Sequence, residues 1–117
     1  MFLGLRTVIY PSPKLADANA WYSNLLGQEP YFDQPLYVGF NVGGYELGLD
    51  PNGDVALGPI AFWGVDNADD AYAELLAKGA VEHAKVQDVG DGIRTATVRD
   101  QGGNVVGIIE NPHFKLP

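Results

Sequence analysis

The sequence predicts an α+β fold in which one small module, running strand, helix, then strands, occurs twice. Two observations support this prediction. β-branched and amphipathic segments follow one another in the same order in both halves of the chain, and the helix residues of the two halves match at a constant offset, as in an internal repeat. A single offset superposes four helix residues of the first half, Ala18, Tyr22, Leu25 and Leu26, on Ala68, Tyr72, Leu75 and Leu76 of the second half. A glycine, Gly27 or Gly79, follows each helix. A chain of 117 residues fits one domain, since domains run to about 100–200 residues. We therefore expect a single domain, 1–117, with internal modules 1–53 and 54–117.

The first module begins with a β-branched strand at residues 5–10, which ends at Pro11. Ser12 and Pro13 predict an N-cap and the first helical position. The helix that follows has an apolar stripe and a natural terminator in Gly27. Its stripe consists of Ala18, Trp21, Tyr22, Leu25 and Leu26. Two strands, 36–42 and 45–50, are then expected to form a hairpin through Gly43-Gly44 before the turn at 50–53.

The second module repeats this order. Residues 59–65 predict a strand, and Asp66-Asn67 can cap the next helix, which ends at Gly79. Its apolar stripe consists of Ala68, Ala71, Tyr72, Leu75 and Leu76. A polar loop is expected next, followed by strands at 93–99 and 104–110 around the turn at 100–103.

Composition limits the possible functions. The chain is 46% hydrophobic and 19% charged, as is ordinary for a globular protein. No apolar run approaches the ~20 residues that cross a bilayer. The first six residues lack the basic and apolar regions of a signal peptide, so a cytoplasmic location is expected. Because there is no cysteine, disulfides, a thiolate nucleophile and Cys-ligated metals are excluded.

The charge is strongly acidic, with 15 Asp and Glu against seven Lys and Arg and a formal net charge of -8. Nucleic acids and anionic membranes are therefore not expected as partners, because they are bound by neutralising phosphates with basic side chains. Two interpretations remain open. The acidity can simply keep the protein soluble, or it can draw a cationic ligand into an acidic cleft.

Two motifs carry a resemblance that spans nearly the whole chain. One is the helix end Ala20-Trp21-Tyr22-Ser23-Asn24-Leu25-Leu26-Gly27, and the other is the strand, turn and strand of residues 92–106. These two motifs, and the order in which they occur, resemble those of the vicinal oxygen chelate superfamily, which includes glyoxalase I, bleomycin-resistance proteins and extradiol dioxygenases. Gln101 stands where the turn of the family has proline. The resemblance implies two βαβββ modules whose mixed sheets curl round a cleft, and commonly a homodimer.

The resemblance also implies four places for metal ligands. Metal-dependent members hold a divalent ion with imidazole and carboxylate groups, and leave open positions for substrate oxygens. In this chain the places fall at Thr7, at Glu46, between Pro59 and Ala61, and at Gly107, so only Glu46 offers a carboxylate. One carboxylate does not hold a catalytic metal, and we expect no cofactor. Strand periodicity places Glu46, Gly48 and Asp50 on one face.

A metal site with displaced ligands stays open as an alternative. His83, predicted in the loop after the second helix, and His113, in the C-terminal tail, are the only imidazoles and are both expected at the surface. With Glu46 and Glu110 they would serve a metal-dependent lyase, isomerase or dioxygenase. A third alternative is an interaction module whose dimer surface is its function.

Aromatic residues on two strands can line the cleft, as ligand pockets are commonly apolar with a few orienting polar groups. Most rings in a small chain must build the core instead. We favour Trp63, because Phe62 and Trp63 occupy opposite faces of one strand and one ring must point away from the helices. The sequence thus predicts a metal-free protein that binds an aromatic or cationic metabolite or drug. Its predicted ligand-binding residues are Thr7, Tyr37, Phe40, Glu46, Asp50, Phe62, Trp63 and Arg94.

Overall fold

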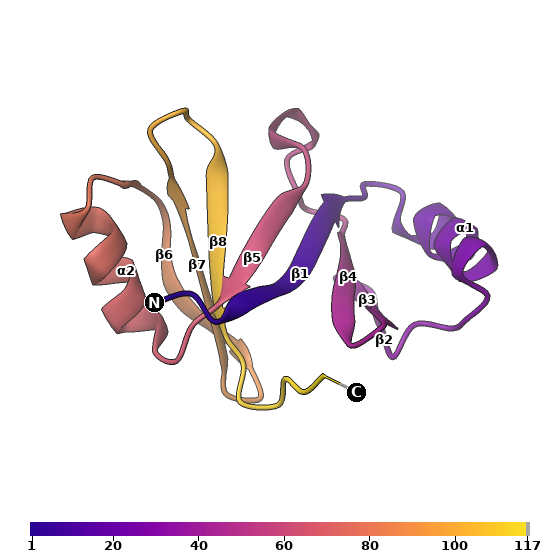
Figure 1. Cartoon of the computed structure of the whole chain (residues 1–117). Helices are drawn as coiled ribbons and strands as arrows, with labels where there is room; N and C mark the ends of the chain where they lie inside the picture. The colour runs from indigo at the N-terminus through magenta and orange to yellow at the C-terminus, as the bar shows by residue number, and fades with distance from the viewer. Residues whose placement is uncertain (117) are drawn as a thin grey trace. The chain divides into compact units, whose positions relative to one another are not determined.

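The computed structural model describes residues 1–116 and divides the chain into two compact units (Figure 1). The N-terminal unit is built on Thr7–Ile60, and the C-terminal unit combines Met1–Arg6 with Ala61–Lys115. Residues 1–6 join the second half of the chain because Leu3 N donates to Gly64 O at 2.8 Å and the Phe2 ring stacks on Trp63. The division therefore falls at other residues than the predicted modules.

The N-terminal unit contains one helix and four strands. They are β1 (Gly4–Pro11), α1 (Leu15–Leu26), β2 (Phe32–Gln34), β3 (Tyr37–Val42) and β4 (Tyr45–Asp50), followed by a short 3₁₀ helix, η1 (Val55–Leu57). The strands lie in the order β2-β3-β4-β1, with β1 parallel to β4 and the other pairs antiparallel. The sequence did not predict β2, a three-residue strand in a polar stretch.

One face of this sheet packs against α1. Three fully buried side chains, Val38, Phe40 and Leu49, form the centre of the core. Around them pack Tyr10, Leu15, Ala18, Tyr22, Leu26 and Leu47. Because side chains alternate between the faces of a strand, the neighbours of these residues in sequence, Tyr37 and Glu46 among them, lie on the face away from α1. Phe40 was predicted to bind a ligand, and its placement in the core removes it from that set.

Helix α1 differs from the prediction at its start and on one side. It begins at Leu15 after Lys14, which makes no side-chain capping bond, while Ser12 Oγ donates to the Tyr10 carbonyl instead of a helix N–H. Trp21 and Leu25 are about 60% exposed (60% and 61%). The predicted stripe was therefore too wide, and its core side is the row Leu15, Ala18, Tyr22 and Leu26.

The C-terminal unit repeats the same order of elements. They are β5 (Ile60–Gly64), α2 (Ala68–Ala77), β6 (Val81–Gly90), β7 (Ile93–Arg99) and β8 (Val105–Glu110), and the strands lie in the order β5-β8-β7-β6. Strand β5 is parallel to β8, and the other pairs are antiparallel. The polar loop expected before residue 93 is in fact the ten-residue strand β6. Both halves are therefore βαβββ modules with mixed strand pairing, as predicted.

Helix α2 covers one face of its sheet. The buried core consists of Val65, Ala68, Ala71, Ala96 and Ile108, with Tyr72, Leu75 and Val86 packed against it. Asn67 Oδ1 accepts a hydrogen bond from Asp70 N at 2.9 Å, which confirms the predicted N-cap. No helix in residues 1–116 has the length and apolar character to span a membrane.

Candidate functional site

A carboxylate that accepts three hydroxyl hydrogen bonds lies on the face of the N-terminal sheet away from α1. Glu46 in β4 is the cross-strand partner of Thr7 in β1, and Thr7 Oγ1 donates to Glu46 Oε1 at 2.5 Å. Tyr37 Oη donates to the same oxygen at 2.8 Å, and Tyr31 Oη donates to Glu46 Oε2. We call these four residues the Glu46 cluster.

Two glycines make room for the cluster. Gly39 and Gly48 are cross-strand partners on the same sheet face. A Cβ atom on Gly39 would lie 2.7 Å from Glu46 Oε2, and one on Gly48 would overlap the Tyr37 hydroxyl. Because Gly39 and Gly48 have no side chain, the Glu46 carboxylate and the Tyr37 phenol can occupy the space above them.

The cluster is part buried and holds its phenols protonated. Thr7 is 4% exposed, whereas Tyr31 is 64% exposed and forms the outer side of the cluster. Burial raises the pKa of the Tyr37 phenol, and the charge of Glu46 raises it further. Burial and the hydrogen bond to Glu46 raise the pKa of the Tyr31 phenol as well. Both phenols therefore act as hydrogen-bond donors, and the carboxylate is the acceptor.

These raised phenol pKa values predict a loss of stability in alkali. An unfolded tyrosine ionises near pH 10, whereas Tyr31 and Tyr37 keep their protons to higher pH in the folded protein. The stabilisation is therefore complete below about pH 10 and is lost as the pH rises beyond that value. We expect the melting temperature to fall in this range and the tyrosinate absorbance to rise with unfolding. Tyr37→Phe should reduce the pH dependence of both the melting temperature and the tyrosinate absorbance. If every tyrosine ionises near pH 10 and the melting temperature does not change, the raised pKa values of Tyr31 and Tyr37 are contradicted.

Asp50 shares the sheet face of Glu46 but serves the turn that follows. Its Oδ1 accepts from Asn52 N at 2.8 Å, and its carbonyl accepts from the backbone N–H groups of Ser12 and Gly53. The predicted ligand-binding residue is thus engaged in local structure at the end of β4.

In the C-terminal unit the structure reverses the predicted roles of two aromatic residues. Phe62 is the cross-strand partner of Gly107 in β8, and its ring occupies the space that a Cβ atom on Gly107 would need. Trp63 is the partner of Ile108, a core residue beneath α2, and stacks on Phe2 with ring centroids 5.2 Å apart. Phe62, not Trp63, therefore lies on the face away from the helix.

Arg94 forms an ion pair in the C-terminal unit. Its Nη1 lies 2.6 Å from Asp69 Oδ2 in the first turn of α2. Hydrogen bonding to Arg94 lowers the pKa of the Asp69 carboxyl. The guanidinium thus ties β7 to the start of α2 and does not approach the face that carries Phe62.

The ligands of the alternative metal site are engaged separately. His83 lies in β6, where its Nδ1 is 2.8 Å from Thr97 Oγ1. Glu110 Oε1 accepts from Ala68 N at 2.8 Å, and His113 Nε2 lies 2.8 Å from the Asp91 carbonyl oxygen. Within residues 1–116, no three Asp, Glu or His side chains come together as ligands for a metal ion.

The ligand places implied by the resemblance do not fit a protein-held divalent metal. Glu46 supplies one carboxylate, and its strand partner Thr7 supplies a hydroxyl that donates to it. Gly107 supplies no side chain, and the Phe62 ring fills the adjoining space. A hard cation needs several oxygen ligands in concert, which these positions do not provide.

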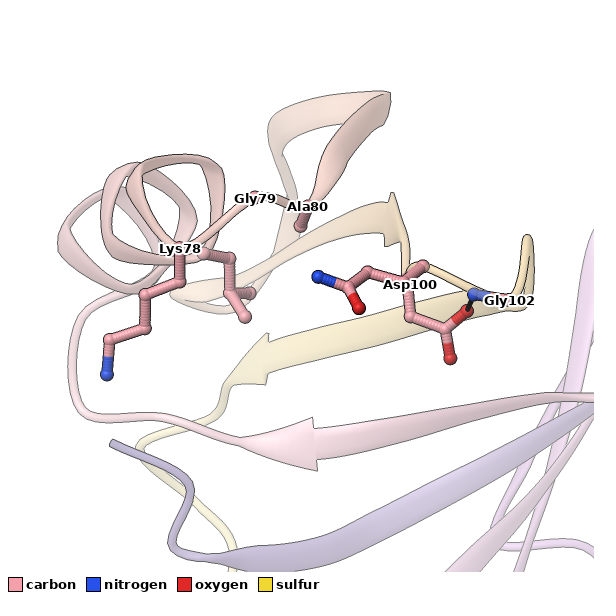
Figure 2. Close-up of a pocket in the computed structure, with 7 residues that line it drawn as sticks. Lys78, Gly79, Ala80, Asp100 and Gly102 are labelled. Carbon is pink, nitrogen blue, oxygen red and sulfur yellow. Dashed lines mark hydrogen bonds between the residues drawn. The ribbon is translucent and has the colours of Figure 1, made fainter.

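A shallow depression in the C-terminal unit lies between the end of α2 and the β7–β8 turn (Figure 2). It has a volume of about 390 Å³ and is lined by Leu75, Lys78, Gly79, Ala80, Asp100, Gln101 and Gly102. The Asp100 carboxylate accepts hydrogen bonds from the side-chain and backbone nitrogens of Asn104 and from Gly102 N, which lower its pKa. The Lys78 side chain extends away from Asp100 in Figure 2. The Asp100 carboxylate therefore serves the turn, and the two charged groups do not converge on a ligand position.

Comparisons with known proteins identify the fold. No family model matches the sequence, and no curated protein matches it. A variant of Streptomyces coelicolor methylmalonyl-CoA epimerase, solved in complex with 2-nitronate-propionyl-CoA, is 14% identical with a TM-score of 0.79, covering 96% of this chain and 99% of that chain. A glyoxalase/bleomycin resistance protein/dioxygenase superfamily member from Vibrio splendidus is 15% identical with a TM-score of 0.65, covering 91% and 97%.

A third solved structure, described as NAD-dependent benzaldehyde dehydrogenase from Legionella pneumophila, is 19% identical with a TM-score of 0.72, covering 88% of this chain and 96% of that chain. At such low identities structural similarity establishes architecture, and an activity has to be argued from the site itself. The chain therefore has the vicinal oxygen chelate fold of the glyoxalase/bleomycin resistance protein/dioxygenase superfamily.

Proposed function

We propose that this protein binds a small aromatic or cationic ligand at the Glu46 cluster without a metal ion held by the chain. The observation that carries the proposal is the carboxylate of Glu46, oriented by the hydroxyls of Thr7, Tyr31 and Tyr37. An ionised carboxylate has about four acceptor positions. A ligand ammonium can use a position that these donors leave, or replace the hydroxyl of the exposed Tyr31.

Aromatic rings beside the carboxylate support an aromatic or cationic ligand. Phe32, 43% exposed, lies next to Tyr37 with ring centroids 6.1 Å apart. Tyr31 adds a further exposed ring. Cations are attracted to the faces of such rings, and the formal net charge of -8 favours the approach of a cation from solution.

The remaining predictions stand beside this proposal. We propose a homodimer in the cytoplasm, as the sequence predicts. The epimerase that shares the fold was solved in complex with 2-nitronate-propionyl-CoA, so an acyl-CoA thioester belongs among the compounds tested. The alternative of a metal-dependent lyase, isomerase or dioxygenase has no support from the placement of His83, His113 and Glu110.

The proposal is tested by a thermal-shift screen and one isosteric substitution. Benzylammonium serves as the aromatic cation, benzyl alcohol as its uncharged counterpart, and divalent metals and an acyl-CoA complete the panel. A ligand of the folded state raises the melting temperature with concentration. Hydrogen bonds to charged groups contribute about 1.5–3 kcal/mol, so Glu46→Gln should weaken benzylammonium binding by about tenfold or more.

Glu74→Gln is the matched control, because it removes one exposed carboxylate of α2 and leaves the cluster intact. Its affinity for benzylammonium should equal that of the unmodified protein. The proposal fails if Glu46→Gln binds as tightly as Glu74→Gln, if no compound of the panel raises the melting temperature, or if the purified protein carries about one tightly held Ni, Zn, Mn or Fe per chain.

A further inference from the structure

The two oxygens of the Glu46 carboxylate differ in how many of their acceptor positions the protein uses. Oε1 accepts from Thr7 Oγ1 at 2.5 Å and from Tyr37 Oη at 2.8 Å. Among residues 1–116, Oε2 accepts from Tyr31 Oη alone. Each carboxylate oxygen offers about two lone-pair positions. Oε1 is therefore filled, and Oε2 keeps one acceptor position for a further donor.

The carboxylate is not neutralised by the described part of the chain. Its three donors are hydroxyl groups, which satisfy lone pairs but bring no positive charge. No Lys, Arg or His of the described residues forms an ion pair with Glu46, unlike Asp69, which is paired with Arg94. A cation that donates to Oε2 would therefore complete both the hydrogen bonding and the charge balance of the Glu46 cluster.

The open acceptor position belongs to the accessible side of the cluster. Both hydrogen bonds to Oε1 are part buried, and Thr7 is only 4% exposed. The hydrogen bond to Oε2 is exposed, and its donor Tyr31 is 64% exposed. Tyr31 N donates to the Gly39 carbonyl at 3.0 Å, which holds the Tyr31 backbone beside the carboxylate. A ligand from solution can thus approach Oε2 without displacing a core side chain.

The phenol rings favour recognition of the cation by a hydrogen bond. A phenol oxygen lies in the plane of its ring, so Tyr31 and Tyr37, which both donate to Glu46, turn their edges toward the carboxylate. A cation–π contact requires the cation over the face of a ring, and quaternary ammonium ligands are bound by cages of several such faces. The faces of Tyr31 and of the neighbouring Phe32 are left for the aromatic part of a ligand.

We propose that the ligand of the Glu46 cluster is a protonated arylalkyl amine that donates an N–H to Oε2, and that quaternary ammonium compounds are rejected. This inference rests on the function proposed above and specifies its class of ligand. A hydrogen bond between charged groups is about twice as strong as a neutral one. A quaternary nitrogen has no N–H, and its methyl groups hold it away from the oxygen, so it cannot form this bond.

The test is a methylation series titrated into the full chain by calorimetry. The series consists of benzylammonium, its N-methyl and N,N-dimethyl derivatives, and benzyltrimethylammonium. The first three compounds keep an N–H, so each of the first two methyl groups should change the dissociation constant by no more than about fourfold, the effect of burying one methylene group. The last methyl group removes the remaining N–H and should weaken binding by about tenfold or more.

Two variants locate this last step at the cluster. Glu46→Gln removes the negative charge that strengthens the hydrogen bond, so the difference between the N,N-dimethyl and trimethyl compounds should shrink. Asp17→Asn is the matched control, because it removes one exposed carboxylate of α1, on the opposite face of the same sheet. It should bind every compound as the unmodified protein does. If Glu46→Gln does not fold, the series on the unmodified protein still decides.

The inference is overturned if benzyltrimethylammonium binds as tightly as the N,N-dimethyl compound, if affinity falls evenly along the series, or if the last step is unchanged in Glu46→Gln. In the first two cases, weaker binding of benzylammonium to Glu46→Gln would still uphold the function proposed above. If benzylammonium does not bind to the unmodified protein, both proposals fail.

Discussion

Phe40→Ala is expected to lower the free energy of unfolding by about 3–5 kcal/mol, the usual cost of removing a buried phenylalanine ring. Phe40 is fully buried (0% exposed) and lies between β3 and α1, beside Leu47 of the next strand. No residue of α1 is itself fully enclosed, so the helix depends on this core for its attachment. The cavity would therefore weaken both the sheet and the position of α1. Urea denaturation followed by circular dichroism measures the effect as a lower midpoint.

Leu25→Ala is the control for this prediction. Leu25 lies on the outer side of α1 and is 61% exposed, so its removal should change the stability by no more than about 0.5 kcal/mol. Leu25 and Phe40 were both assigned to buried or binding surfaces by the sequence pattern. Equal losses of stability in the two variants would mean that α1 presents a different face to the sheet than the structure describes.

The sequence predicted those elements whose signals are local. The hairpin at Gly43-Gly44, the cap at Asn67 and the end of α1 at Gly27 each depend on residues within a few positions of one another. Strand β6 was missed because its residues are mostly polar and exposed, and because register shifts interrupt its pairing with β7. The pattern of alternating apolar residues that marks a half-buried strand is weak there.

The candidate site was predicted in part, for a similar reason. Thr7, Tyr37 and Glu46 lie on regular strands and were among the predicted ligand-binding residues, and the strand pairing of the structure brings them to one face. Tyr31 precedes the short strand β2 and lies in a polar stretch without a strand pattern; in the folded sheet its N–H donates to the Gly39 carbonyl and its hydroxyl donates to Glu46. The choice between Phe62 and Trp63 depended on which face α2 covers, which the pattern of a single strand does not reveal.

Ile108→Ala is expected to lower the free energy of unfolding by about 2–5 kcal/mol, since it opens a cavity in the core of the C-terminal unit. Ile108 is fully buried (0% exposed) beneath α2, against Ala68 and Ala71. Tyr72 and Leu75 of α2 pack against the same core, so the size of the loss depends on how far these side chains close the cavity. Val81→Ala, at a 61% exposed position of β6, should change the stability by no more than about 0.5 kcal/mol.

The two core variants, Phe40→Ala and Ile108→Ala, also test the proposal that residues 1–117 form one domain. Half-domains of this size bury too little surface to be stable alone, and β1 begins in the C-terminal unit and ends in the N-terminal unit. We therefore expect one cooperative transition, which Phe40→Ala and Ile108→Ala each move as a whole. Their effects should add in the double variant, because the two residues belong to separate cores. If instead two unfolding transitions are resolved and each substitution moves only one of them, the units unfold independently. Each core would then stabilise only its own module.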